Sequence, residues 1–134
     1  MPAVDKCHEQ FVRALQKDGW ITRSNPFFTT ESRDIFVDVE AFKQENGTRR
    51  RILLAEIKCF AQQTPIELYV AIGQYLIYRT LLTQIENAAP LYLAVPETIY
   101  VTMFDEIARL TIKNYGIKML IVNLDEESIV QWIE

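Results

Sequence analysis

The chain has 134 residues, of which 49% are hydrophobic and 24% are charged; this balance predicts one folded domain over residues 1–134 and excludes a disordered chain. Its net charge of -4 argues against the broad basic surface with which some proteins hold nucleic acid over many phosphates. No apolar run is long enough to cross a bilayer, and one histidine with two cysteines argues against a zinc site.

The first half of the chain is predicted to contain one helix and a β-hairpin. Asp5 is a candidate N-cap, and the apolar residues after it recur at helical spacing until Gly19, which favours a stop. Asn46-Gly47 is typical of a tight turn and lies between two apolar runs. The strands expected here cover residues 20–28 (as a short strand or an extended loop), 34–42 and 51–60.

The second half is predicted to alternate helices and strands. Thr64-Pro65-Ile66-Glu67 forms a capping box with proline at the first helical position, and it opens a long helix. The helices expected here cover residues 65–87 and 97–115, and the strands cover 90–96, 117–124 and 128–133. A hairpin followed by crossovers through helices predicts an α/β fold, with a mixed sheet and helices packed on its faces.

Two ionisable residues, Glu56 and Lys58, interrupt the apolar strand that follows the hairpin turn. Strand alternation puts them on one face together with Ile52, Leu54 and Phe60, while the opposite face is wholly apolar. A solvated face would explain the two charges only if the three apolar residues beside them were solvated too. This strand is therefore expected to carry two charges in a largely buried position.

The hairpin brings Asp38 to the same place. A turn centred on Asn46-Gly47 puts Asp38 beside Glu56, and a three-residue loop puts it directly opposite Glu56. Asp34 falls near Cys59, or near Lys58 if the register slips. Two close carboxylates repel each other unless a cation lies between them or one of them holds a proton. Mg²⁺, or Mn²⁺ in its place, suits such a pair because it takes carboxylates, waters and substrate phosphate oxygens as ligands.

This cluster has the groups that phosphodiester hydrolysis requires. A lysine beside the two carboxylates can stabilise charge on the phosphate and orient the attacking water. The alternative is an ordinary ion pair between Glu56 and Lys58 at the sheet surface, offset by Asp38. Because the Glu-x-Lys pattern is common by chance, the residues alone leave the two interpretations about equal.

Other residues are weaker candidates for the same site. Gln74 and Tyr78 lie at i and i+4 of the long helix, where an amide and a phenol on one face could hold a nucleic-acid backbone. Glu9 of the first helix could approach as a further acidic group, and Arg49-Arg50-Arg51 could hold phosphates. For all of these, a solvated helix face or a charged hairpin tip is the more ordinary explanation.

The two cysteines, Cys7 and Cys59, are expected to be small buried residues. They form neither a disulfide framework nor a C-x-x-C pair. Because the N-terminus has no secretory signal, we expect a reducing cytoplasm, in which thiols stay reduced.

The ordered set of an aspartate, a hairpin, Glu-x-Lys and a helix with Gln-x-x-x-Tyr resembles the PD-(D/E)xK nuclease superfamily, which includes restriction endonucleases and Holliday-junction resolvases. A closer resemblance covers residues 2–133. The segments "LQKDGWIT", "DIFVDVEAF", "AEIKCF", "GQYLIYRTLL", "PLYLAVPE" and "IVQWI" are similar, in this order, to the XisH-like fdxN-element excision controlling factors of cyanobacteria.

The resemblance implies a restriction-endonuclease-like mixed β-sheet with flanking helices. It also implies a role in programmed DNA excision in heterocysts, beside a recombinase and a small XisI-like protein. Carried over by position, Asp38 and Glu56 would bind the metal, Lys58 would be the catalytic lysine, and Gln74 would belong to the catalytic set. Asp34 is the second choice for Asp38. Tyr78 matches the helix motif of the family. The sequence departs from the family pattern at Cys59, where a serine is expected, and at Glu9, where an aspartate is usual.

The first functional interpretation is a Mg²⁺-dependent, nuclease-like hydrolase that acts on DNA during element excision and binds DNA weakly on its own. The alternative is a non-catalytic accessory protein that keeps the nuclease fold and binds an XisI-like partner, which the low net charge favours. A third interpretation is a toxin–antitoxin-like pair in which this partner holds the nuclease silent. Self-association into a homo-oligomer stays open, and no membrane contact is expected.

Overall fold

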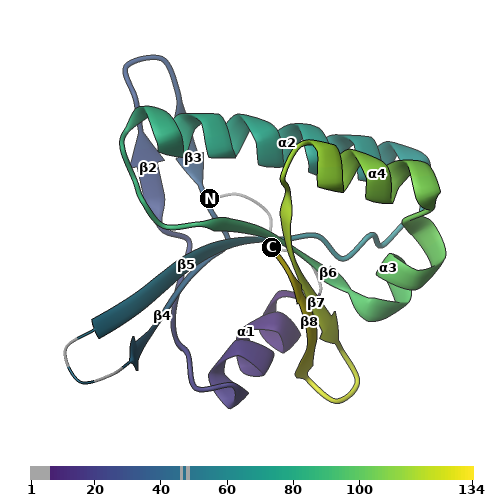
Figure 1. Cartoon of the computed structure of the whole chain (residues 1–134), viewed down its shortest axis with the longest axis horizontal. Coiled ribbons are helices and arrows are strands. Elements are labelled where there is room, and N and C mark those ends of the chain that lie inside the picture. The colour runs from purple at the N-terminus through teal and green to yellow at the C-terminus, as the bar shows by residue number, and fades with distance from the viewer. Residues whose placement is uncertain (1–6, 46, 48) are drawn as a thin grey trace.

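The computed structural model describes residues 7–45, 47 and 49–134. Its helices and strands follow one another in the order that an α/β fold requires (Figure 1). In chain order they are α1 (His8–Lys17), β1 (Ile21–Ser24), β2 (Phe27–Thr29), β3 (Asp34–Phe36), β4 (Val39–Glu45), β5 (Arg49–Ile57), α2 (Pro65–Gln84), β6 (Leu91–Pro96), α3 (Glu97–Met103), α4 (Glu106–Asn114), β7 (Lys118–Asn123) and β8 (Ser128–Ile133).

Among the described residues, one mixed sheet contains six strands in the order β1-β4-β5-β6-β7-β8. β5, β6 and β7 run parallel at its centre, and antiparallel strands flank them on both sides. β2 and β3 form a separate antiparallel hairpin, which projects from the sheet beside α2 (Figure 1). The predicted fold class, a mixed sheet with helices packed on its faces, is confirmed.

Two apolar cores lie on the two faces of this sheet. Successive strand residues point to opposite faces, so Leu54 packs with residues of α2, α3 and α4, whereas Leu53 and Ala55 pack with α1. Figure 1 shows the same division, with α2 across one side of the sheet and α1 on the other. Every residue of β6 is buried, as expected for a central parallel strand that is covered on both faces.

The predicted helix ends agree with the structure where they can be compared. The capping box is confirmed, because Glu67 N–H donates to Thr64 Oγ1 (3.4 Å) and Thr64 N–H donates to Glu67 Oε1 (3.1 Å). Gly19 follows α1 with a φ of 94°, which favours glycine. Asp5 lies outside the described residues, and Cys7 is the N-cap of α1.

In the described part of the chain, no helix is both long and apolar enough to span a membrane.

The predicted helix over residues 97–115 is wrong, because the chain forms two helices there. The break falls at Phe104, which is buried in the core, and Asp105, whose backbone is extended. Asp105 Oδ1 accepts a hydrogen bond from the N–H of Ala108 (2.9 Å) and so caps α4. A short side chain that bonds the nearby backbone in this way favours the start of a new helix over continuation of the old one.

Candidate functional site

Asp38 lies where the chain passes from the small hairpin to the main sheet. The predicted strand over residues 34–42 is wrong at this point, because it divides into β3 and β4. Val37 N–H donates to the carbonyl of Pro26 (3.0 Å), and Asn25 N–H donates to the carbonyl of Asp38 (2.9 Å). These hydrogen bonds fix the backbone where the chain passes from the β2–β3 hairpin to the six-stranded sheet. Asp38 therefore has a fixed position between β3 and β4.

The hairpin register places Asp38 beside Glu56, at the end of β5. Val39 pairs with Ala55, which is the pairing of the three-residue loop, so the prediction that Asp38 faces Glu56 is borne out by the register. Asp38 N–H donates to Glu56 Oε1 (3.2 Å), and Ile57 N–H donates to Asp38 Oδ2 (2.7 Å). Each carboxyl group therefore accepts a hydrogen bond from a backbone N–H near the other, and these bonds fix both groups in place.

Burial and mutual repulsion make Glu56 a weak acid. Glu56 is 4% exposed, and burial first, then the charge of Asp38, raises its pKa to about 8, against the opposing effect of Lys58. Burial also raises the pKa of Asp38, and the hydrogen bond from Ile57 is the largest opposing effect. With a pKa of about 8, Glu56 keeps its proton for the most part at neutral pH.

Lys58 completes the predicted cluster. Its Nζ lies 3.8 Å from Glu56 Oε2, and its side chain is 24% exposed whereas that of Glu56 is 5% exposed. The lysine therefore reaches from solvent toward two buried carboxyl groups. Its backbone is anchored, because Lys58 N–H donates to the carbonyl of Ala94 (2.9 Å) in the neighbouring strand.

Gln74 and Tyr78 of α2 lie on the same side of the sheet as the carboxyl groups. Gln74 Nε2 donates to Tyr78 Oη (2.9 Å), as their spacing on one helix face suggests. Burial raises the pKa of Tyr78, the bond from Gln74 lowers it, and the charges of Glu56 and Asp38 raise it further. The phenol is therefore close enough to the two carboxyl groups to respond to their charge.

The structure does not bring the other predicted residues into this cluster. Asp34 is exposed on β3 and accepts a hydrogen bond from the hydroxyl of its strand partner Thr29. Glu9 is exposed on α1, where its charge acts on Arg13. Arg50 stacks over the ring of Phe42 (4.2 Å). The guanidinium of Arg51 lies over the ring of Trp20 (5.4 Å) and pairs with Glu134 (3.8 Å). The side chain of Arg49 lies outside the described residues.

Two features of the site were missed by the sequence analysis. His8 is 4% exposed, its charge lowers the pKa of Asp38, and its Nδ1 has no hydrogen-bond partner among the described residues. The expectation that the two cysteines are separate buried residues is wrong, because Cys7 and Cys59 form a disulfide. No local pattern indicates either feature, since both depend on where α1 lies against the end of β5.

The donor set fits a small hard cation. One oxygen of each carboxyl group accepts a backbone hydrogen bond, while Glu56 Oε2 faces only the more distant Lys58. Among the described residues, no group of three or more His, Cys, Asp or Glu side chains is placed to hold a metal ion. Asp38 and Glu56 could therefore hold an ion such as Mg²⁺, which keeps several waters and takes phosphate oxygens as further ligands.

Comparison with known proteins identifies a family. The family model described as XisH protein matches residues 1–130. The chain is similar to an XisH family protein from Nostoc punctiforme PCC 73102, with a TM-score of 0.84 and 30% identity over 97% of this chain and 100% of that one. It is also similar to a fdxN element excision controlling factor protein from Anabaena variabilis, with a TM-score of 0.82 and 32% identity over 95% and 97%. No protein with curated annotation matches the chain.

Proposed function

Since the chain belongs to the XisH protein family, we propose that it is a metal-dependent, nuclease-like protein that acts on DNA phosphodiester bonds during excision of a DNA element. The role in excision is supported by the relative from Anabaena variabilis, which is a fdxN element excision controlling factor. The nuclease chemistry is supported by one observation: the carboxyl groups of Asp38 and Glu56 are buried side by side, where the ionisation of Glu56 is opposed, and Lys58 is a cation that reaches them from solvent.

Each residue of the cluster has a distinct role in this proposal. Asp38 and Glu56 would hold Mg²⁺ or Mn²⁺. The bound ion would neutralise charge on the phosphate and activate a water molecule. Lys58 donates hydrogen bonds to a phosphate oxygen and orients the attacking water, because its ammonium extends from the buried carboxyl groups toward solvent. Gln74 fixes the phenol of Tyr78 beside the carboxyl groups, where it can position the nucleic-acid backbone.

The raised pKa of Glu56 makes metal binding a proton-linked event. Glu56 has a pKa of about 8, so at neutral pH it must lose its proton before its oxygens can serve as ligands. Binding should therefore release a proton and tighten as the pH rises toward 8. An exposed carboxylate is already ionised at neutral pH and would show no such dependence.

Mn²⁺ binding tests the site directly. Mn²⁺ should raise the melting temperature of the wild-type chain by mass action on the folded state, and Glu56→Gln should remove most of that rise. Asp34→Asn is the matched control, because Asp34 is an exposed acid on β3, in the separate hairpin, and its loss should leave the rise intact. An equal rise in wild type and Glu56→Gln would place the metal elsewhere and contradict the proposal.

DNA cleavage tests the chemistry. With Mg²⁺ or Mn²⁺ present, nicking of plasmid DNA should fall by about a hundredfold or more in Lys58→Met, a loss typical of removing a group that positions or transfers a proton. Arg13→Ala, which alters an exposed pair far along α1, should cut like wild type. The test is made on the chain alone and together with its partner protein. If wild-type protein does not cleave DNA in either case, or if Glu56→Gln cleaves as well as wild type, the nuclease proposal is wrong.

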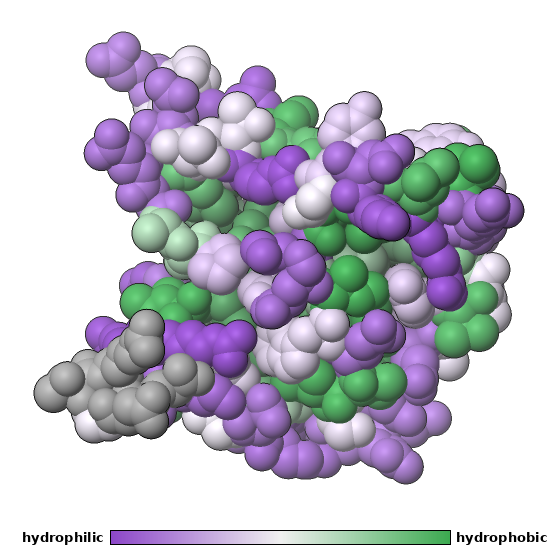
Figure 2. Space-filling model, viewed as in Figure 1, coloured by the Kyte–Doolittle hydropathy of each residue, from purple (hydrophilic) through white to green (hydrophobic). Residues whose placement is uncertain are grey.

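A second candidate function, that of an accessory protein that binds an XisI-like small protein, is favoured by an exposed apolar surface. A groove of about 680 Å³ runs between α2 and α4 and includes Tyr69, Ile107 and Met103 in its lining. Tyr69 and Ile107 are exposed, and Ile66 and Leu110 extend the surface. Figure 2 shows hydrophobic residues at the surface over α3 and α4. Such a patch on a small protein usually marks a contact with another protein.

The two functions are separable because their residues lie apart. Ile107→Asp should abolish a complex with an XisI-like protein in size-exclusion chromatography and leave the Mn²⁺ response of the chain unchanged. Glu56→Gln should do the reverse. If the complex forms and suppresses cleavage, the partner holds the nuclease silent. If the chain alone elutes as an oligomer that Ile107→Asp disperses, the same groove serves self-association instead.

A further inference from the structure

The disulfide lies where two segments of the candidate site meet. Cys7 directly precedes the buried His8 at the start of α1, and Cys59 directly follows Lys58 after β5. The bond spans a sequence separation of 52 residues and joins one face of the sheet to the end of its central strand. It therefore links the residue beside the lysine to the residue beside the histidine.

The segment after Lys58 has an irregular backbone. Residues 58–64 form neither helix nor strand, and Phe60 and Gln63 have positive φ values (57° and 52°). Lys58 N–H donates to the carbonyl of Ala94, and the later N–H groups donate to the carbonyl of Phe60 and to the side chain of Glu67. The disulfide adds a cross-link at Cys59, directly beside the lysine whose ammonium must reach Glu56.

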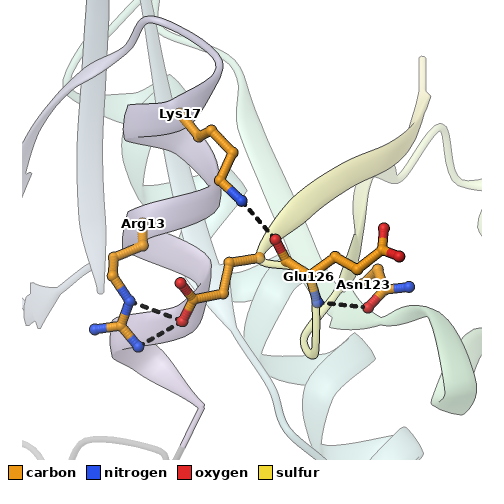
Figure 3. Close-up of polar contacts among 5 residues, drawn as sticks. Arg13, Lys17, Asn123 and Glu126 are labelled. Atoms are coloured by element: carbon orange, nitrogen blue, oxygen red, sulfur yellow. Dashed lines mark hydrogen bonds and ion pairs between the residues drawn. The ribbon is translucent and has the colours of Figure 1, made fainter.

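The remainder of α1 is held in place without the disulfide. Arg13 pairs with Glu127 (2.6 Å), and Lys17 Nζ donates to the carbonyl of Glu126 (2.5 Å). Figure 3 shows both contacts between α1 and the turn that precedes β8. Breaking the disulfide would release the first turn of α1, which contains His8, while these contacts keep the rest of the helix docked.

We propose that the Cys7–Cys59 disulfide is a redox control of the Asp38–Glu56–Lys58 site. In the oxidised protein the bond holds Lys58 and His8 in the arrangement of the assembled site. Reduction by a small dithiol frees both and disorders the site. The effect on DNA rests on the proposed function. The effect of the disulfide on the order of the site does not, since that order can be measured without metal or nucleic acid.

The exposure of the two sulfurs sets the course of the exchange. Cys7 is buried, whereas Cys59 is partly exposed, so an incoming thiolate attacks the sulfur of Cys59. Cys7 leaves as a thiolate, which the N-terminus of α1 stabilises, and it then takes up a proton. The second thiol of the reductant displaces Cys59 and closes a cyclic disulfide. Two electrons and two protons pass to the protein, and a disulfide oxidant such as oxidised glutathione reverses the exchange.

The proposal accords with the reducing compartment that the sequence predicts. In such a compartment a disulfide forms transiently, and the disulfides found there are usually catalytic or redox-sensing.

Backbone order parameters measured by NMR test the proposal in EDTA. The N–H of Ile57 bonds to Asp38 Oδ2 and that of Lys58 bonds to Ala94, so both report the order of the site. Reduction with dithiothreitol should lower both order parameters from about 0.85 to below about 0.6, while Leu120 and Ile121, which are buried in β7, stay rigid. Cys7→Ser and Cys59→Ser should each behave like the reduced wild type and ignore the oxidant.

Two results would overturn the proposal. One is equal order parameters of Ile57 and Lys58 in oxidised and reduced protein. The other is an equal fall in β7, which would make the bond a general structural cross-link. Mn²⁺ melts and DNA cleavage separate this proposal from the proposed function. Equal Mn²⁺ response and cleavage in both redox forms would overturn the redox control alone. No response in either form, with the order parameters still redox-dependent, would overturn the nuclease function alone.

Discussion

Glu56 is the residue in which burial and chemistry conflict most directly. It lies on the apolar face of β5, and its pKa of about 8 follows from that burial and from the nearby charge of Asp38. A structural ion pair needs an ionised glutamate, whereas a pKa of about 8 keeps most of Glu56 protonated at neutral pH. This state suits a group that ionises only when a metal ion takes the place of the proton.

The raised pKa predicts how stability depends on pH. Between about pH 4.5 and 8 the unfolded chain ionises Glu56 while the folded chain keeps its proton, so the folded state binds more protons. The free energy of unfolding should therefore fall by a few kcal/mol as the pH rises through this window, and level off above it. Urea unfolding in EDTA at several pH values measures this loss.

Glu56→Gln should remove most of this pH dependence, because the amide does not titrate. Glu106→Gln, an exposed residue in the first turn of α4, is the matched control and should keep the wild-type dependence. Identical slopes in wild type and Glu56→Gln would mean that Glu56 is ionised in the folded protein.

Glu56 and Lys58 should also respond unequally to mutation when no metal is present. Gln in place of a protonated glutamate keeps both a donor and an acceptor, so Glu56→Gln should be neutral or stabilising near pH 8. Lys58→Met leaves two carboxyl groups without their cation and should destabilise the protein. Denaturant melts in EDTA compare the two. Large, equal losses of about 3–5 kcal/mol in both variants would indicate a structural ion pair and contradict the catalytic assignment.

At the scale of elements, the sequence predicts the hairpin well and the break beside it poorly. The hairpin follows from a local turn signal, and its register brings Asp38 to Glu56. Residues 34–42 alternate throughout, so nothing local shows that the chain changes sheets at Asp38. The break depends on hydrogen bonds with Asn25 and Pro26, which the alternation of one strand cannot reveal.

The cross-link between α1 and the end of β5 predicts a measurable loss on reduction. Closing a loop over 52 residues lowers the entropy of the unfolded chain, and the loop-entropy model gives about 4 kcal/mol of stabilisation. Reduced wild type should unfold at lower urea concentration than oxidised wild type, by an amount that corresponds to this loss. The double variant Cys7→Ser, Cys59→Ser is the control and should match the reduced protein with or without reductant.

At the scale of the whole molecule, the site joins residues that the sequence keeps far apart. Asp38, Glu56 and Lys58 lie on one hairpin, so a strand pattern and a turn signal suffice to predict their meeting. His8 and Cys7 reach the same place only because α1 packs against the far face of the sheet. Sequence reasoning therefore finds the chemical groups of one hairpin but misses those that tertiary packing supplies.

The net charge of the whole molecule limits its affinity for DNA. With a net charge of -4, the isolated chain should bind duplex DNA no better than about 10⁻⁴–10⁻⁶ M at physiological salt, and more weakly as salt rises. Arg50 is exposed and stacks on Phe42, so Arg50→Ala should weaken binding and reduce the salt slope by about 1. Arg51→Ala is the matched comparison. Arg51 already pairs with Glu134, so this change should reduce the slope less. Fluorescence anisotropy between about 50 and 200 mM salt measures both slopes. Tight binding that ignores salt and survives both changes would mean that DNA is held elsewhere, whereas a basic partner that restores affinity would locate the missing charge in the complex.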